Sequence, residues 1–149
     1  MPKNVSVLSA SPRKGGNSDL LCDQFVLGAK EAGHQVEKLF LRDKRIIAEV
    51  IVMATPVYFY NMNGQLKTLI DRTYARYTEI GNKEMYFIMT AAVTRKDLLQ
   101  TTLESFRGFT SCLNGAKERG VIYGTGAWKK GDLKGSAAMT QAYEMGKKA

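Results

Sequence analysis

The stretch NVSVLSASPRKGGNSDLL, residues 4–21, predicts a strand, a polar loop and the start of a helix. Within residues 9–18 it holds three hydroxyl side chains, two cations, two glycines and a proline. A strand and a helix can be joined by only a few residues, and small residues alone are enough. The excess of hydroxyls and cations therefore points to a function at this loop.

Apolar periodicity along the rest of the chain predicts an alternation of strands and helices. The expected strands are 5–8, 35–41, 49–54, 85–90 and 120–124. The expected helices are 18–32, 64–74, one that opens at Thr94 with a capping box completed by Asp97, and one that begins at Ser136. This alternation predicts a single α/β domain, residues 1–149, with a parallel sheet and helices on both faces.

The composition limits the class of protein. The two cysteines are distant and form no CxxC pair, which favours a reducing, cytoplasmic setting and argues against a metal site. Cys22 is expected beside the core and inert. The net charge of +8 suggests an anionic partner. The first strand begins early and no apolar run approaches about 18 residues, so we expect neither a signal peptide nor a membrane span.

Three loops are expected at the carboxyl edge of the sheet, where ligands of open α/β folds bind: 9–17, 55–63 and 90–94. The first offers serine hydroxyls, the Arg13 guanidinium, two glycines and a helix N-terminus, which together suit a phosphate group. No GxxxxGK[ST] or GxGxxG motif follows the first strand, so neither a nucleoside triphosphate loop nor a dinucleotide loop is indicated. The alternative is a well-capped helix preceded by a basic, solvated loop.

The second loop adds three consecutive aromatic residues, Tyr58, Phe59 and Tyr60, at the end of an apolar strand. Aromatic side chains there can stack on a flat ring while backbone amides meet its polar edge. They can equally pack in a subunit interface. A phosphate loop beside an aromatic loop suggests flavin mononucleotide (FMN) as the ligand.

Two segments, SASPRKGGNSDLL and ATPVYFYNMNGQLKTLIDR, together with GTGAWKKGDLKGS near the end, resemble the NADPH-dependent FMN reductase family of the flavodoxin-like superfamily, close to the iron-sulfur-flavoprotein-like oxidoreductases. The resemblance implies a flavodoxin-like three-layer sandwich with a five-stranded parallel sheet of order 2-1-3-4-5. It also implies FMN as cofactor, NADPH or NADH as electron donor, a small-molecule acceptor such as a quinone, azo compound or metal ion, and a homodimer or homotetramer.

The family's binding residues map onto three groups of positions in this chain. The FMN phosphate would be held by Ser9, Ser11, Arg13, Asn17 and Ser18. The isoalloxazine ring would lie along Pro56, Val57, Tyr58, Phe59 and Asn61. The pyrimidine side of the ring would be approached by Thr90, Ala91 and Ala92.

The cofactor supplies the redox chemistry in such a reductase, so we expect no catalytic side chain and no metal ligand. Two alternatives stay open. One is a flavodoxin-type electron carrier that binds FMN without reacting with nicotinamide. The other is a module that binds nucleic acid or another polyanion, which the net charge alone supports.

Two further features carry expectations. Trp128, in a glycine-rich loop after the last strand, either covers the ligand or packs within its own loop. The link between the second and third strands, 42–48, is shorter than the dozen or more residues of an ordinary parallel crossover. We therefore predict that residues are missing from the sequence at 43–48 and that the backbone has a gap there.

Overall fold

A single parallel sheet is the centre of the fold in the computed structural model, which describes residues 2–9, 15–39 and 48–149. Its strands are β1 (Asn4–Ser9), β2 (Gln35–Leu39), β3 (Val50–Tyr58), β5 (Glu84–Thr90) and β6 (Lys117–Gly124). A two-residue strand, β4 (Asn61–Met62), pairs antiparallel with β3. The order β2-β1-β3-β5-β6 is the flavodoxin-like order, so the expected fold is confirmed, with β4 as a sixth strand that the sequence did not predict.

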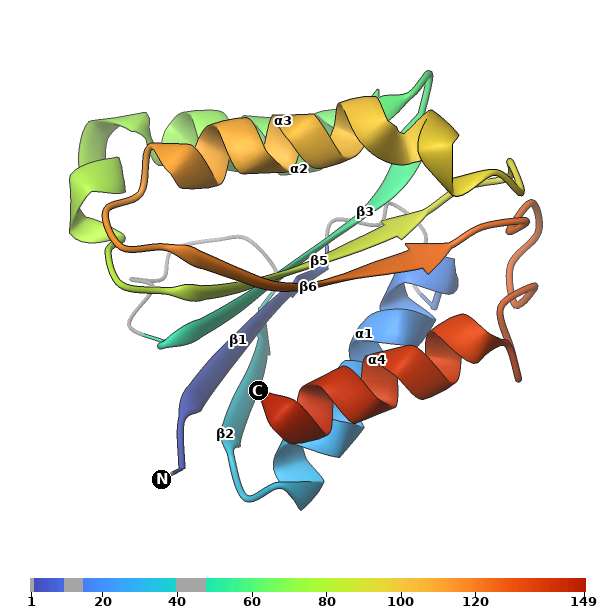
Figure 1. The fold of residues 1–149 in the computed structure, drawn as a ribbon, viewed down its shortest axis with the longest axis horizontal. Helices are drawn as coiled ribbons and strands as arrows, with labels where there is room; N and C mark the ends of the chain where they lie inside the picture. The colour runs from blue at the N-terminus through green and yellow to red at the C-terminus, as the bar shows by residue number, and fades with distance from the viewer. Residues whose placement is uncertain (1, 10–14, 40–47) are drawn as a thin grey trace.

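Helices cover both faces of this sheet (Figure 1). α1 (Asn17–Glu31) and α4 (Ala137–Lys148) lie on one face, and α2 (Gly64–Arg72) and α3 (Gln100–Ser111) lie on the other. The 3₁₀ helix η1 (Tyr74–Glu79) follows α2, and the 3₁₀ helix η2 (Lys96–Leu99) directly precedes α3. None of the helices within the described ranges is long and apolar enough to cross a membrane.

Successive side chains of the central strands point to opposite faces of the sheet and pack in two separate hydrophobic cores. Val50 and Val52 pack with α1 and α4, whereas Ile51 and Met53 pack with α2 and α3. All four side chains are buried, which explains why residues 50–54 of β3 are a continuous apolar run rather than an alternating one. Each core holds an aromatic pair: Phe25 meets Tyr86 edge-on at 5.0 Å between ring centroids, and Phe87 stacks on Phe106 at 4.7 Å.

Two glycines allow α1 and α4 to touch through their backbones. A Cβ atom at Gly28 would lie 2.1 Å from the Tyr143 carbonyl oxygen, and one at Gly146 would lie 2.1 Å from the Phe25 carbonyl oxygen. No side chain fits at either position unless the helices move apart. This contact fixes the last helix of the chain against the first.

Several element boundaries differ from the sequence prediction. β3 continues to Tyr58, and β6 begins at Lys117. The capping box expected at Thr94 and Asp97 is wrong: α3 begins at Gln100, and the Asp97 carboxylate accepts from Arg95 Nε at 3.1 Å instead. A salt bridge between neighbouring side chains has replaced the cap, and the single 3₁₀ turn η2 leads into the helix.

The link between β2 and β3 runs over residues 40–49 because β2 ends two residues earlier than expected and β3 begins one residue later. Leu39 pairs with Leu8 and Val50 with Val5, so the chain must return three residues along β1 and cross two strand spacings. Each leg is about 10 Å, which ten residues can reach, although ten is still short for a parallel crossover. Residues 40–47, and with them the predicted gap, lie outside the described residues.

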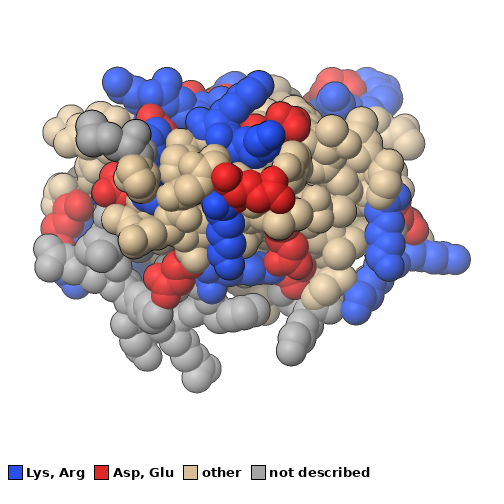
Figure 2. All heavy atoms as spheres, turned by 90° about the horizontal axis from the view of Figure 1, so that it is seen from below, with Lys and Arg blue, Asp and Glu red and all other residues tan. Residues whose placement is uncertain are grey.

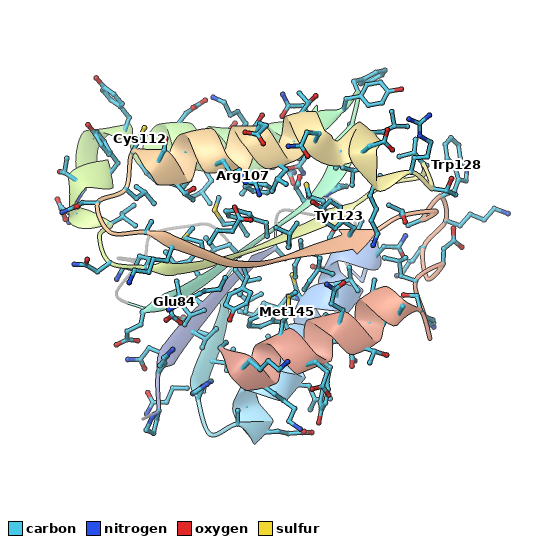
Figure 3. The ribbon with its side chains drawn as sticks, in the orientation of Figure 1. Glu84, Arg107, Cys112, Tyr123, Trp128 and Met145 are labelled. Atoms are coloured by element: carbon cyan, nitrogen blue, oxygen red, sulfur yellow. The ribbon has the colours of Figure 1, made fainter. Side chains whose placement is uncertain are left out.

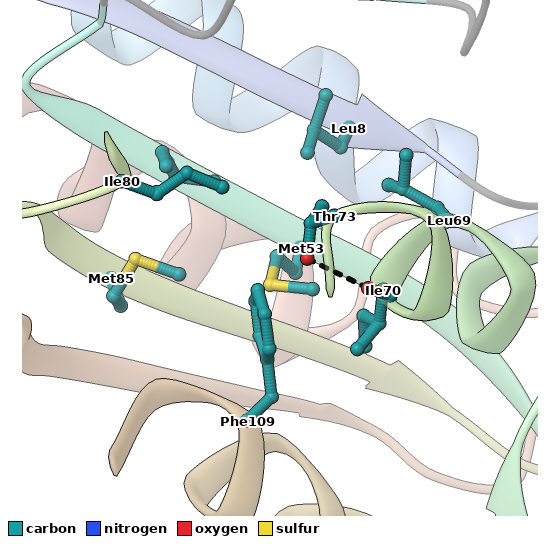
Figure 4. A pocket seen from close by; sticks show the side chains of 9 residues that line it. Leu8, Met53, Leu69, Ile70, Thr73, Ile80, Met85 and Phe109 are labelled. Atoms are coloured by element: carbon teal, nitrogen blue, oxygen red, sulfur yellow. Dashed lines mark hydrogen bonds between the residues drawn. The ribbon is translucent and has the colours of Figure 1, made fainter. Parts of the chain in front are cut away.

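A small apolar cavity of about 20 Å³ lies between the sheet and the α2/α3 layer (Figure 4). Its wall includes the methyl side of Thr73, whose hydroxyl donates to the Ile70 carbonyl at 2.7 Å. The cavity has room for about one water molecule, but its lining is apolar and offers that water no polar partner, so it is a packing defect rather than a ligand site. Its lining residues are Leu8, Ile51, Met53, Leu69, Ile70, Thr73, Ile80, Met85 and Phe109.

Candidate functional site

The carboxyl ends of β1, β3, β5 and β6 lie at one edge of the sheet (Figure 1). Hydrogen bonds join the start of α1, the end of β5 and the loops after β5 and β6. The Ser18 and Thr90 hydroxyls, both buried, lie 2.7 Å apart and join the first turn of α1 to the end of β5. The Ala127 amide donates to the Ala91 carbonyl at 2.8 Å, which ties the loop after β6 to the loop after β5. The site is therefore built as one connected unit.

A buried carboxylate organises the start of α1. Asp19 is 5% exposed and accepts hydrogen bonds from the Ser9 hydroxyl and from the Gly15 amide, the latter at 2.8 Å. Lys38 Nζ on β2 lies 3.5 Å from Asp19 Oδ1 and 2.7 Å from Asp23 Oδ1. Burial lowers the pKa of Lys38, but the hydrogen bond to Asp23 and the two negative charges outweigh it and hold that pKa above its ordinary value.

The Asn17 side chain faces the loop after β6. Its Nδ2 donates to the Lys129 carbonyl at 3.0 Å, and its Oδ1 accepts from the Gly131 amide at 3.0 Å. Asp132 stabilises the same loop by accepting from the Lys129 amide at 2.6 Å. The first and last loops of the edge therefore meet at Asn17.

The aromatic loop is a tight hairpin between β3 and β4. Phe59 and Tyr60 occupy its two turn positions with φ of 50° and 63°, a left-handed conformation that bulky residues rarely adopt. Phe59 is 100% exposed, and Tyr58 and Tyr60 are about half exposed. The chain therefore accepts backbone strain and solvent exposure to present aromatic rings at this edge.

The β4 side of the hairpin is anchored to the neighbouring helices. The Tyr60 carbonyl accepts from the Thr102 hydroxyl of α3 at 3.0 Å, and Asn61 Oδ1 accepts from the Ser105 hydroxyl at 3.2 Å. Below the turn, Asn63 caps α2 by accepting from the Leu66 amide at 3.1 Å. These contacts hold the strained turn on two helices of one face.

The structure places the sequence-predicted residues as follows. Ser11 and Arg13 lie outside the described residues. Ser9, Asn17, Ser18, Thr90 and Ala91 meet around the start of α1, and Ala92 is exposed at the same edge. Pro56 and Val57 are partly buried on β3 below the hairpin that carries Tyr58, Phe59 and Asn61.

Sequence reasoning missed Asp19 and Lys38, whose partnership joins a helix to a strand that pairs alongside β1. An acidic residue in a first helical turn signals a favourable helix dipole, not a buried ion pair. Trp128 is 76% exposed and projects from the loop after β6 at this edge (Figure 3). No cluster of three potential metal ligands occurs among the described side chains.

Comparison with known proteins finds a matching family over part of the chain. The model of the NADPH-dependent FMN reductase family matches residues 46–110, which include the aromatic hairpin. The resemblance expected from the sequence motifs is thereby confirmed over that segment. The first loop lies outside the match.

Individual relatives are more distant. An iron-sulfur flavoprotein of Archaeoglobus fulgidus is 27% identical over 99 residues, which cover 47% of this chain and 44% of the relative, so the chain spans less than half of that protein. The solved structure of an NAD(P)H:quinone oxidoreductase from Methanothermobacter marburgensis matches with a TM-score of 0.76 at 15% identity. The match covers 99% of this chain and 96% of that protein's chain. An azoreductase from Bacillus anthracis has a TM-score of 0.76 at 15% identity over 100% of both chains. At these identities the structures establish the shared fold.

Proposed function

We propose that this chain is a single FMN-binding domain, residues 1–149, and that it works as an FMN-dependent NAD(P)H oxidoreductase. The family match over the aromatic hairpin is the observation that carries this proposal. The donor set at the edge of the sheet supports it, because it combines a helix N-terminus and backbone amides for a phosphate with aromatic residues for a flat ring. The described residues fit the cofactor.

When bound, FMN supplies the redox chemistry by accepting a hydride from the nicotinamide and passing electrons to an acceptor. The chain's own contribution is to bind and orient. The hydrogen bonds among the loops hold the start of α1 and the end of β5 in place, which reduces the conformational freedom that ligand binding must remove. The anchored hairpin presents Tyr58 and Phe59 beside the same edge.

The acceptor and the assembly are parts of the proposal. A quinone or an azo compound is the acceptor class suggested by the two solved neighbours. The family resemblance supports a homodimer or homotetramer, and the two distant cysteines support a cytoplasmic location. The fully exposed Phe59 ring supports burial against a ligand or a second copy.

The binding test compares FMN with riboflavin, which lacks the phosphate. Purified protein should bind FMN in preference, and Arg13→Ala should weaken FMN by about 1.5–3 kcal/mol while hardly changing riboflavin. Equal losses for both flavins would show that the first loop does not hold the phosphate.

The activity test separates a reductase from an electron carrier. With FMN bound and oxygen removed, excess NADPH or NADH should bleach the flavin absorbance within seconds, and a quinone should restore it. A flavin that stays oxidised for hours under both nicotinamides, yet is reduced by dithionite, would favour the carrier.

On the face seen in Figure 2, the charges of the described residues give the polyanion-binding alternative no support. Lys and Arg side chains on that face are interspersed with Asp and Glu rather than gathered into one basic surface. Several cations are paired, including Lys3 with Glu84 at 2.8 Å and Arg107 with Glu118 at 2.9 Å. Such pairing leaves less positive charge to attract a nucleic acid.

A further inference from the structure

The loop after β6 brings a lysine to the backbone of the first loop. Gly15 has φ of +69°, and a Cβ atom placed on it would lie 3.2 Å from Lys130 Nζ and 3.4 Å from Lys130 Cε. The ammonium group is therefore beside Gly15, one residue before the N-cap of α1. These two residues are more than a hundred positions apart in the sequence.

Asn17 holds this lysine in place. Its amide bonds to the Lys129 carbonyl and to the Gly131 amide, both at 3.0 Å, so the two hydrogen bonds bracket Lys130. Because the amide uses a donor and an acceptor at once, it fixes the backbone on either side of the lysine. A hydrogen-bonded clamp of this kind limits where the flexible lysine stem can begin.

The charges of the described residues favour a cation at this place. The buried Asp19 carboxylate accepts from the Gly15 amide, and Lys38 is shared between Asp19 and Asp23. That cluster of two carboxylates and one ammonium carries a net negative charge. A phosphate brought to the start of α1 would be repelled by these described carboxylates, so a cation beside Gly15 favours its binding.

We propose that Lys130 is a binding residue for the FMN phosphate and that Asn17 is the positioning residue that places it. This inference rests on the proposed function. It assigns the phosphate subsite a cation from the opposite end of the chain, in addition to the residues of the first loop. A lysine ammonium acts on phosphate as a point charge, so its contribution is screened by salt.

The experiment measures the dissociation constants of FMN and riboflavin by flavin fluorescence at low and high salt. Lys130→Met keeps most of the side-chain stem and should weaken FMN about tenfold at low salt, and less at high salt, with riboflavin within twofold. Lys134→Ala removes the same charge from the same loop and should leave both flavins within twofold. Lys130→Arg should retain most of the FMN affinity.

Asn17→Ala should also weaken FMN, and the double variant Asn17→Ala/Lys130→Met should bind FMN about as weakly as Lys130→Met alone. Losses that multiply would show that Asn17 does not act through Lys130. If Lys130→Met matches Lys134→Ala, or weakens riboflavin as much as FMN, the role of Lys130 is overturned while FMN binding stands. If the unmodified protein binds neither flavin, the proposed function itself fails.

Discussion

The buried hydroxyl pair of Ser18 and Thr90 gives a quantitative test of how the site is held together. Ser18 is 1% exposed and Thr90 5%, and their oxygens lie 2.7 Å apart. Thr90→Val keeps the shape of the side chain but leaves the Ser18 hydroxyl buried without this partner, which should cost about 1–3 kcal/mol of unfolding free energy. Ser18→Ala should cost a similar amount for the same reason.

The double variant decides the interpretation. When both hydroxyls are removed, no unpaired polar group is left by the change, so the double variant should be little less stable than either single variant. Urea unfolding followed by circular dichroism gives the four free energies, and the coupling energy should be at least about 1 kcal/mol. Thr94→Val, at an exposed threonine of the same loop, is the control and should change stability by less than about 0.5 kcal/mol. Additive losses from the two single changes would refute the reasoning.

Four further outcomes are expected. Gly146→Ala should destabilise the protein, because the new Cβ would lie 2.1 Å from a backbone oxygen of α1. Gly108→Ala has no atom within 4 Å of the new Cβ and should stabilise the protein by about 0.5–1 kcal/mol. Urea unfolding should therefore show changes in unfolding free energy of opposite sign for the two variants. A maleimide should label the exposed Cys112 at once and Cys22 only after unfolding, since burial raises the pKa of the Cys22 thiol to about 12; intact mass should count one adduct on the folded protein. The hydrogen bond from Lys3 holds the pKa of the Glu84 carboxyl below its usual 4.5. The stability that Glu84 contributes is therefore present above pH 4.5 and is lost as the pH falls through the folded-state pKa. Glu84→Gln should lower the melting temperature at pH 7 and make the melting temperature fall less steeply in acid. Intact mass should exceed 16.5 kDa by a few kilodaltons if a crossover helix of about 20–40 residues with its loops is missing between β2 and β3, and a mass equal to that of the printed sequence would make the short link genuine.

The fold was predictable because its elements follow local patterns. Apolar patterns and strong stop signals, such as Gly33 after α1, predicted the existence and order of the parallel strands and the α-helices among the described residues. The boundaries were less accurate where tertiary contacts decide them. β3 continues through Pro56 because that residue pairs beside Thr90, although a proline followed by aromatics reads as a loop.

The candidate site was predictable as an edge but not as a set of contacts. Which loops meet follows from the strand order, and that order follows from the fold class. The direction of each side chain does not: Asn17 faces Lys129 and Gly131, and the Ser9 hydroxyl faces Asp19. The partners of Asn17 are more than a hundred residues away, and even the ten-residue separation of Ser9 and Asp19 spans a loop whose course the sequence pattern does not predict.

The hydrogen bonds between Asn17 and the loop after β6 also determine when the start of α1 reaches its final structure during synthesis. The partners of Asn17 lie 112 and 114 residues further along the chain, and α4, which packs against α1 through Gly28 and Gly146, follows them. While the ribosome is still making β6, α1 has neither its clamp nor its neighbouring helix. Contacts of such long separation form late, because a large loop must close before they can be made. The edge that we propose as the flavin site is therefore completed only after the loop following β6 and α4 have emerged, so a chain truncated before them should not be able to retain the cofactor.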